Sequence, residues 1–413
     1  MLRRVTPETM PIRDRAAVDP VTFTAASAIV DDVRAGGESA LRRHAERLGD
    51  IAPGGQLIYE SNALQRAVAT LPAADRAVLE RAAGRIAAFA DAQKKCLTPL
   101  DVAVPGGRAG HTIAPMRRAG CYAPAGRFPL PSSVLMTVVT ARVAGVETVW
   151  AASPRPNALT LAAAGIAGAD ALLAVGGAQA IAALAYGAGP VPAVDVIVGP
   201  GNRWVTAAKQ RVSGEVAIDM LAGPSELVVL ADDTADPEVV AADLLAQAEH
   251  DTDALPILVT PSVVLADAVD AALGRQLATL PTADTARVAC EAGFTVLVAD
   301  VDEGIAVCDL LAPEHLEVLT AHADAVAPRL RHYGGLFVGA GAAEVLGDYG
   351  AGPNHVLPTG GTARQTGGLS VFTFLRVRTW LRMDAPAELA RDAAHLARLE
   401  GLEGHARSAE KRA

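Results

Sequence analysis

Residues 148–177 read TVWAASPRPNALTLAAAGIAGADALLAVGG, and their pattern indicates the fold class. Two short apolar segments flank an Ala-rich segment with the length of a helix, and glycines mark the junctions. Strands that alternate with helices in this way predict a parallel sheet covered by helices. The alternation continues on both sides of this stretch. The expected helices are 131–145, 157–167, 178–187 and 202–213, and the expected strands are 148–153, 171–176 and 194–199.

A second series of strands and helices lies further along the chain. Asp236, Pro237 and Glu238 form the start signal of a helix, with an N-cap residue, a proline in the first turn and an early acid. This helix is expected to end near His250. The expected strands of this series are ELVVLAD (226–232), ALPILVT (254–260), FTVLVAD (294–300) and GLFVGA (335–340).

The two ends of the chain have a different pattern. Residues 21–95 have apolar and charged residues at helical spacing, and residues 369–413 lack strands and end in a charged helix. The expected fold class is α/β, with two adjacent Rossmann-like parallel-sheet domains, a helical N-terminal segment and a small helical C-terminal domain. The expected division is an arm at 1–20, a first α/β domain from 21–121 plus 225–368, a second at 122–224, and a tail at 369–413.

The bulk composition limits the class of partner. The chain has 413 residues, 51% of them hydrophobic, and a net charge of −10. An acidic chain lacks the basic surface that nucleic-acid binding needs, so we expect no nucleic-acid partner. Four scattered cysteines without CxxC spacing fit a reducing compartment. We see neither a signal peptide nor a membrane span and expect a cytoplasmic protein without membrane contact.

A possible metal site lies at the end of the helix that begins at Asp236. Gln247 and His250 are three residues apart, so they share one face of that helix. Imidazole together with an oxygen donor suits zinc. A helix C-terminus also favours His because of the helix dipole, and on this motif alone the helix end is the favoured interpretation.

Two further segments carry polar residues that could do chemistry. GDYGAGPNH (347–355) follows a strand, which is where ligands bind in α/β folds, although Asp and Asn are also ordinary turn residues. Glu314 and His315 are adjacent and could act as an acid–base pair. In a helix they would point about 100° apart, and on this motif alone a solvated pair at a helix end is the favoured interpretation.

Two junctions between a strand and a helix contain glycines and a side-chain amide. Gln179 lies in LLAVGGAQAIAALA and Asn202 lies in DVIVGPGNRWVTAAK. Such junctions can hold phosphates through backbone N–H groups and the helix dipole, although neither matches the GxGxxG dinucleotide pattern and both also fit a tight turn. Near the C-terminus, Glu400 and His405 lie in a charged helix that also reads as an exposed tail.

Taken together and in order, these segments are specific. From about residue 20 to its end the chain resembles the histidinol dehydrogenase family. The segments that carry the resemblance are LPSSVLMTVVTARVAG, VGGAQAIAALAYG, VDVIVGPGN, AIDMLAGPSE, LLAQAEHD, APEHL, GDYGAGPNHVLPT and EGLEGH.

The resemblance implies a set of site residues. The implied zinc ligands are Gln247, His250, Asp348 and His405, and the implied acid–base residues are Glu314 and His315. The implied substrate contacts are Ser225, Gln247, His250, His315, Asp348, His355, Glu400 and His405, and the implied NAD contacts are Tyr122, Gln179 and Asn202. The domain at 122–224 would then hold NAD, and the domain formed by 21–121 and 225–368 would hold zinc. The family is a homodimer in which the C-terminal helix completes the partner's site, so we expect residues 369–413 to be exchanged.

The implied reaction is the oxidation of L-histidinol to L-histidine, the last step of histidine biosynthesis. It proceeds by two hydride transfers to NAD through a bound aldehyde, with one zinc ion in each subunit. Related enzymes with the same metal framework oxidise other polar alcohols, including sulfonated diols, so a paralogue acting on such an alcohol is the alternative. A zinc hydrolase built on Gln247, His250 and Asp348 is a further alternative, and the two glycine junctions argue against it.

Overall fold

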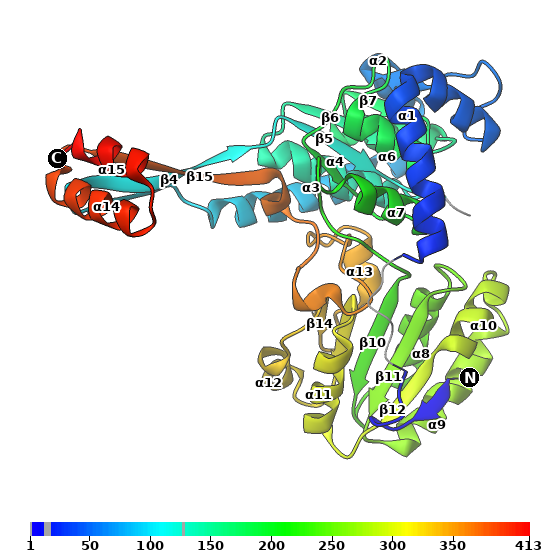
Figure 1. The fold of residues 1–413 in the computed structure, drawn as a ribbon. Coiled ribbons are helices and arrows are strands. Elements are labelled where there is room, and N and C mark those ends of the chain that lie inside the picture. The colour runs from blue at the N-terminus through cyan, green and yellow to red at the C-terminus, as the bar shows by residue number, and fades with distance from the viewer. Residues whose placement is uncertain (1, 12–17, 126–128) are drawn as a thin grey trace.

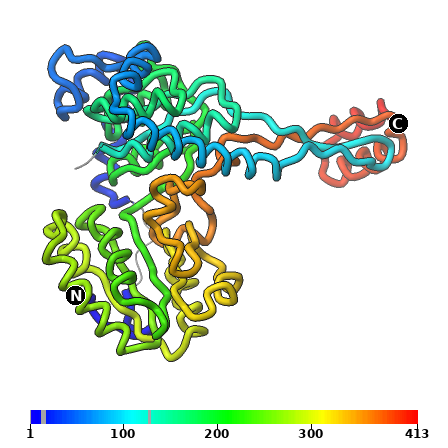
Figure 2. Tube along the Cα trace, turned by 180° about the vertical axis from the view of Figure 1, so that it is seen from behind, coloured from blue at the N-terminus to red at the C-terminus, as the bar shows by residue number. Residues whose placement is uncertain are grey.

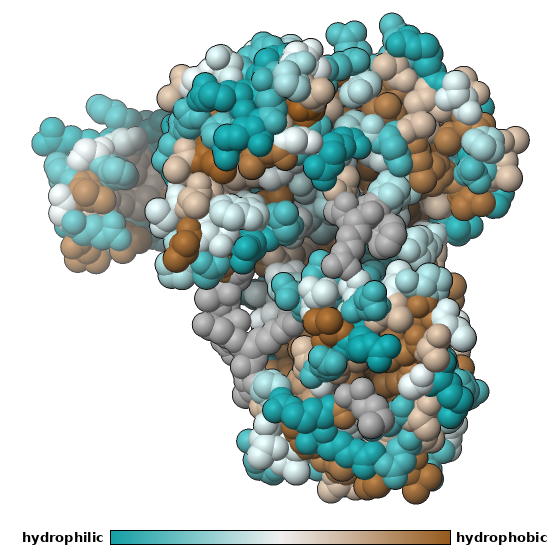
Figure 3. Space-filling model, turned by 90° about the vertical axis from the view of Figure 1, so that its right-hand side faces the viewer, coloured by the Kyte–Doolittle hydropathy of each residue, from teal (hydrophilic) through white to brown (hydrophobic). Residues whose placement is uncertain are grey.

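The computed structural model describes residues 2–11, 18–125 and 129–413. Two six-stranded sheets form two lobes, and a long antiparallel ribbon leaves the first lobe and carries a pair of helices at its far end (Figures 1 and 2). Figure 3 shows one lobe above the other, with the pair of helices at the end of the ribbon, called the C-terminal unit below, off to one side. The sheets confirm the α/β class and its two parallel-sheet domains.

Sheet I forms the first lobe. Its strands pair in the order β2 (Ile58–Glu60), β7 (Ala171–Leu173), β6 (Thr148–Ala152), β5 (Arg118–Tyr122), β8 (Val196–Val198) and β9 (Ala217–Ile218). Its helices are α1 (Pro20–Arg47), α2 (Ser61–Thr70), α3 (Ala73–Lys95), α4 (Pro131–Ala144), α5 (Ala158–Ala167), α6 (Gly177–Tyr186) and α7 (Arg203–Val212). The pairing of β2 with β7 is antiparallel and the other pairings are parallel. Every element expected between 131 and 213 is present within a few residues of its expected ends.

The N-terminal helices belong to this lobe, which changes the expected division of the chain. One core cluster joins α3, α4 and α5 on one face of sheet I, and another joins α1, α6 and α7 on the opposite face. Residues 21–121 therefore share both core clusters of the first lobe with 122–224. They also contact the later part of the chain, because Val356 joins the cluster around α3 and Arg85 Nε donates to the Gly350 carbonyl at 2.5 Å. The sequence grouping separated 21–121 from 122–224 because β2, a three-residue strand, and β5 were not recognised as members of the same sheet.

Sheet II forms the second lobe and is entirely parallel. Its strands pair in the order β1 (Arg3–Val5), β12 (Phe294–Leu297), β11 (Leu255–Thr260), β10 (Glu226–Ala231), β13 (His315–Leu319) and β14 (Gly335–Val338). Its helices are α8 (Pro237–Ala248), α9 (Val263–Leu277), α10 (Ala283–Ala292), α11 (Val301–Leu311), α12 (Ala323–Val326) and α13 (Glu344–Asp348), with short 3₁₀ turns at Ala327–Arg329 and Thr362–Arg364.

Two sequence predictions, the start of α8 and the arm at 1–20, can be compared with the structure of this lobe. The Asp236 carboxylate accepts from the Glu238 N–H and caps α8, as the start signal predicts. The expected arm at 1–20 instead contributes β1, which pairs with β12 at the edge of sheet II, while residues 12–17 of that arm lie outside the described part of the chain.

The ribbon corrects the expectation that residues 369–413 lack strands. After a 3₁₀ turn at Val371–Phe374, β15 (Leu375–Met383) pairs antiparallel with β4 (Gly107–Pro115), which also pairs with β3 (Leu100–Val104). The segment LRVRTW alternates apolar residues with Arg and Thr, which is the pattern of a strand with two different faces. Beyond it lie α14 (Ala387–Leu399) and α15 (Glu403–Glu410), joined by a small cluster of alanines.

No helix among the described residues is long and apolar enough to cross a membrane.

Candidate active site

The candidate site lies where the two lobes meet. Ser225 precedes β10, and Glu314 and His315 lie at the start of β13, so these residues mark the amino edge of sheet II. Tyr122, at the end of β5, and Asn202, after β8, mark the carboxyl edge of sheet I. The two edges are linked directly, because Ser133 at the start of α4 lies 3.3 Å through its Oγ from His355 Nε2. The catalytic candidates therefore occupy the amino edge of their sheet, not the carboxyl edge expected of an α/β fold.

His315 is a buried imidazole with one satisfied nitrogen. Its Nδ1 lies 3.3 Å from the Glu226 carbonyl oxygen, and its Nε2 is buried without a hydrogen-bond partner among the described residues. Since a carbonyl oxygen only accepts, Nδ1 carries the proton and Nε2 presents a lone pair. Burial lowers the pKa of His315 to about 3, so the ring is neutral near pH 7.

Glu314 is a buried carboxyl held in place by two donors. Its Oε2 accepts from Ser225 Oγ at 2.5 Å and from the Glu226 N–H at 3.0 Å. Burial raises its pKa well above the usual value, although both hydrogen bonds oppose the rise. The motif alone suggested a solvated pair at a helix end, and the structure shows that this interpretation of Glu314 and His315 is wrong. They lie at the start of a buried strand, with Glu314 Oε2 3.7 Å from His315 Nδ1.

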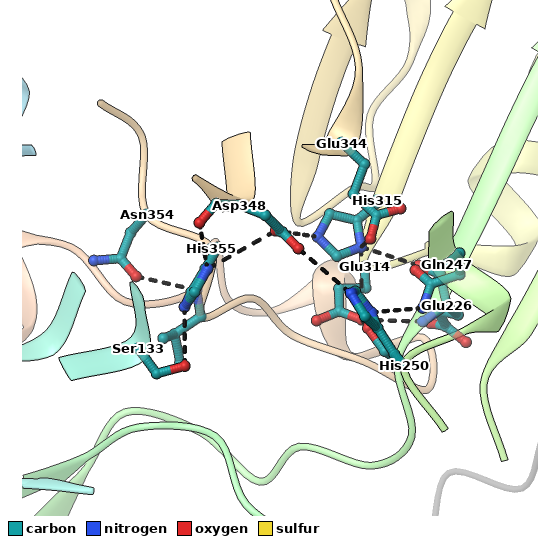
Figure 4. A network of polar contacts seen from close by, with 12 residues as sticks. Ser133, Glu226, Gln247, His250, Glu314, His315, Glu344, Asp348, Asn354 and His355 are labelled. Carbon is teal, nitrogen blue, oxygen red and sulfur yellow. Dashed lines mark hydrogen bonds and ion pairs between the residues drawn. The ribbon is translucent and has the colours of Figure 1, made fainter. Parts of the chain in front are cut away.

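The candidate metal ligands of sheet II also converge. Figure 4 shows Asp348 between His355 on one side and His315 and His250 on the other. Asp348 Oδ2 lies 3.8 Å from His250 Nε2, and Asp348 Oδ1 lies 3.8 Å from His315 Nε2. Burial raises the pKa of Asp348 to about 6. A cation at this point would relieve the cost of the buried carboxylate.

Glu344 is a member of this cluster that the sequence did not reveal. Ligand atoms of His250, Glu344 and Asp348 all lie within 4.8 Å of one another. In the orientation that satisfies its hydrogen bonds, the Gln247 amide nitrogen donates to both Glu344 oxygens, at 3.1 and 3.2 Å. Burial and the nearby Asp348 and Glu314 raise the pKa of Glu344 well above its usual value. The i, i+4 spacing of Glu344 and Asp348 on α13 was the one signal that could have found it.

His355 ties the segment after α13 to the first lobe. Its Nδ1 lies 3.1 Å from the Asp348 carbonyl oxygen and its Nε2 faces Ser133. The neighbouring Asn354 donates to the Met136 carbonyl of α4 at 2.9 Å. Burial lowers the pKa of His355 to about 4, so this ring is also neutral near pH 7. The segment 347–355 is thus a contact between the lobes as well as a set of polar residues.

The three candidate cofactor residues lie along the carboxyl edge of sheet I. The Gly177 N–H donates to the Tyr122 hydroxyl at 3.3 Å, and Gln179 Nε2 donates to Asp50 Oδ2 at 2.8 Å. Gln179 Oε1 is buried without a hydrogen-bond partner within the described part of the chain. Asn202 caps α7, accepting from Trp204 N–H at 3.1 Å and from the following N–H at 3.3 Å. This edge combines a buried amide oxygen without a partner among the described residues with the N-termini of α6 and α7, and helix N-termini suit the phosphates of a dinucleotide.

The two C-terminal candidates are not brought to the site within one chain. Glu400 follows α14 and His405 lies on α15, and both are exposed at the far end of the ribbon, away from both lobes (Figures 1 and 2). The two residues lie together, because both line one hollow of the C-terminal unit with Leu396 and Leu402. The structure of one chain therefore brings together Gln247, His250 and Asp348 and leaves Glu400 and His405 apart from them.

Comparison with known proteins places this geometry in a family. The family model described as histidinol dehydrogenase matches residues 13–413. The chain belongs to the histidinol dehydrogenase family. It is 47% identical to histidinol dehydrogenase of Thermus thermophilus, covering 95% of each chain, and 48% identical to that of Nitratidesulfovibrio vulgaris, covering 96% of this chain and 92% of the relative.

The solved structure of a histidinol dehydrogenase from Elizabethkingia anophelis has the same fold over the whole length. It matches with a TM-score of 0.92 at 28% identity and covers 100% of this chain and 98% of that one. The family therefore extends over both lobes, the ribbon and the C-terminal helices. This chain is an oxidoreductase of the histidinol dehydrogenase type.

Proposed function

We propose that the enzyme oxidises L-histidinol to L-histidine in two successive NAD-linked steps, with zinc in the site and an aldehyde that stays bound. This is a step of histidine biosynthesis. The observation that carries the proposal is the convergence of a neutral His315, a hydrogen-bonded Glu314 and the cluster around Asp348 at one point between the lobes. Membership of the family supplies the substrate.

Zinc is proposed to bind to Gln247, His250 and Asp348, with His405 from a second copy of the chain as the fourth ligand. Imidazole and oxygen ligands suit zinc, and the buried carboxyls of Glu344 and Asp348 favour a cation beside them. Glu344 is proposed to orient the Gln247 amide, because a carboxylate that accepts from the nitrogen turns the oxygen away from itself. Bound zinc would orient the imidazole and amino nitrogens of the substrate, and Ser225, His355 and Glu400 would complete the substrate contacts.

His315 is proposed to remove the hydroxyl proton during the first hydride transfer. Its Nε2 has the free lone pair, faces Asp348 and is buried. The hydrogen bond between Nδ1 and the Glu226 carbonyl fixes the tautomer that makes Nε2 the base. Since its pKa is near 3, His315 needs no deprotonation before it acts.

Glu314 is proposed to activate the water that hydrates the aldehyde. Its Oε2 is occupied by Ser225 Oγ and the Glu226 N–H, which fixes the carboxyl and leaves its other oxygen for a water molecule. Its raised pKa makes the carboxylate a stronger base than an exposed glutamate. His315 would then act again in the second oxidation.

NAD is proposed to lie along the carboxyl edge of sheet I, where it would supply the hydride acceptor for both steps. Tyr122, Gln179 and Asn202 lie there, and the Ser133–His355 contact brings this edge to the catalytic cluster. The placement follows the rule that nucleotides bind at the carboxyl ends of parallel strands.

A homodimer is proposed to complete the site. Glu400 and His405 share one hollow but lie at the end of the ribbon, and α14 exposes large apolar side chains beside them: Leu396 is 58% and Leu399 72% exposed. Apolar side chains left uncovered on so small a unit favour a second copy as the cover. In the dimer, the C-terminal unit of one chain would supply Glu400 and His405 to the other.

The direct test is NADH formation from L-histidinol by the full-length, zinc-loaded enzyme, followed at the nicotinamide absorbance. We expect steady turnover. A folded, zinc-loaded dimer without turnover would contradict the substrate, and a panel of amino alcohols and diols would then identify a paralogue. A hydrolase would show no NAD binding in calorimetry.

A further inference from the structure

A charged pair is buried in the first lobe, away from the residues assigned to catalysis. Lys209 on α7 and Asp219, directly after β9, form an ion pair whose side chains are 3% and 0% exposed. Burial of two charges carries a desolvation cost that is recovered only with good geometry and further hydrogen bonds. The further hydrogen bonds that Lys209 and Asp219 make therefore indicate the role of the pair.

Both polar backbone groups of Gly199 are held by this pair. Lys209 Nζ donates to the Gly199 carbonyl oxygen at 3.0 Å, and Asp219 Oδ2 accepts from the Gly199 N–H at 2.7 Å. Asp219 Oδ1 also accepts from the Met220 N–H at 2.6 Å. Lys209 is itself too deeply buried to reach a ligand, so its effect must pass through the backbone that it contacts.

Gly199 opens the junction Gly199–Asn202 between β8 and α7. Its φ is +116°, and a Cβ atom at this position would lie 1.9 Å from the Tyr122 carbonyl oxygen. The junction is thus pressed against Tyr122 on one side and ends at Asn202 on the other, and both residues are proposed cofactor contacts. A residue with a Cβ atom could not make this approach, so the position requires glycine. Glycine is also the least restricted residue, and the hydrogen bonds from Lys209 and Asp219 limit the conformations that it can take.

The connector that begins at Asp219 is anchored separately on the second lobe. The Gly223 N–H donates to Thr359 Oγ1 at 2.5 Å, and the Leu255 N–H donates to the Ser225 carbonyl at 3.0 Å. Ser225 also donates to Glu314. Loss of the Asp219 contacts should therefore change the junction at Gly199 and leave Glu314 and His315 in place.

We infer that Lys209 and Asp219 are positioning residues for the dinucleotide: the pair fixes the Gly199–Asn202 junction in the shape that receives NAD. The inference rests on the proposed function, which places NAD at this edge. It predicts that loss of the pair weakens NAD binding and leaves substrate and metal binding unchanged. The reason is that groups which support the ligand-contacting residues influence the affinity for that ligand.

The test uses the full-length enzyme with Lys209→Met, Asp219→Asn and the double variant Lys209→Met/Asp219→Asn. Calorimetry gives the Kd for NAD, steady-state kinetics give the two KM values, and elemental analysis gives the zinc content. Lys209→Met should raise the Kd for NAD about ten- to a hundred-fold, the range in which supporting groups act. The KM for L-histidinol should change less than about two-fold, which is below a third of the free energy of a ten-fold change. The zinc content should stay at the wild-type level.

The double variant separates positioning from stability. Lys209→Met leaves Asp219 as a buried unpaired charge, and the double variant removes that charge. A purely structural pair predicts that stability and NAD affinity recover together. The inference predicts recovery of the melting temperature without recovery of NAD affinity, because the Gly199 carbonyl still lacks its donor.

Arg142→Met is the matched control. Arg142 Nε donates to the Gly168 carbonyl at 2.8 Å, and its guanidinium pairs with Asp170 at 2.7 Å, but this pair lies at the opposite, amino edge of sheet I. This variant should lose stability without any change in the Kd for NAD. Unchanged NAD affinity in the folded Lys209 and Asp219 variants would overturn the inference, and so would failure of all three to fold, since the pair would then be a folding element. A wild-type enzyme that binds no NAD would instead contradict the proposed function.

Discussion

His315 Nε2 lies 3.8 Å from Asp348 Oδ1, and the opposite ring nitrogen lies 3.3 Å from the Glu226 carbonyl oxygen. The proposed base and a proposed metal ligand therefore face the same point. The Glu226 carbonyl fixes the tautomer of His315 through the other ring nitrogen. A substrate bound at Asp348 would have its reacting carbon within reach of a base that is already deprotonated.

The first prediction concerns His315→Asn. Asparagine is smaller than histidine and keeps a polar N–H donor, but it supplies no base. We expect kcat for L-histidinol to fall about 10²- to 10⁴-fold, the usual contribution of a general base. Zinc content should stay at the wild-type level, which elemental analysis of the purified protein measures. Loss of zinc together with activity would instead make His315 a part of the metal site.

The second prediction separates Glu314 from His315. Glu314→Gln keeps an acceptor for Ser225 and the Glu226 N–H, but an amide is not a base. Oxidation of the supplied aldehyde should fall about 10²-fold or more, since hydration loses its base. Oxidation of the alcohol in a single turnover should be much less affected. Equal loss in both steps would contradict the division of roles.

The third prediction concerns pH. Burial raises the pKa of Glu314, so its carboxylate is present above the raised value and is lost as the pH falls through it. The pKa of His315 is about 3, so its base form is present throughout the neutral and mildly acidic range. Oxidation of the aldehyde should therefore decline on the acid side before the first hydride transfer does. Stopped-flow rates of the two steps from pH 5 upward measure this, and coincident profiles would contradict it.

The fourth prediction concerns Glu344→Gln. Both oxygens of the Glu344 carboxylate accept from the Gln247 amide nitrogen. A glutamine at position 344 would present one acceptor and one donor, so the Gln247 amide could turn either its nitrogen or its oxygen toward it. The Gln247 oxygen would then lose its fixed direction. We expect zinc affinity to fall about 10- to 100-fold, the usual effect of a group behind a metal ligand. Competition with a chelator measures the affinity, and wild-type zinc retention would argue against this role.

The fifth prediction concerns exchange of the C-terminal unit. Neither His405→Ala nor His250→Ala should be active alone. Mixed dimers of the two should contain one site with both histidines, so random mixing should recover about a quarter of the wild-type activity. If each chain supplied its own His405, mixing would recover none.

The sequence predicted the two sheets well because short apolar strands and Ala-rich helices with glycine junctions are local patterns. The helices and strands between 131 and 213 were predicted in this way. It did not predict β15, or that residues 21–121 pack on sheet I, because those depend on pairing between segments far apart in the chain. Ribbon strands that are largely exposed leave a weak apolar signal.

The site shows the same division. Gln247 and His250 could be chosen from their spacing on α8, and family resemblance added Asp348 and His405. Glu344 was missed because an isolated glutamate in AAEVLGDYG resembles any surface acid until folding buries it beside Asp348. The pair Glu314–His315 was expected on a helix because a two-residue motif does not reveal that it opens a buried strand.

The most direct test is the stoichiometry of the reaction. Limiting L-histidinol should be incubated with zinc-loaded enzyme and excess NAD, and both NADH and the amino-acid product should be measured. Two NADH for each L-histidine formed, with no free aldehyde, is the predicted result. One NADH with the aldehyde released into solution, or no NADH at all, would contradict two oxidations at one site.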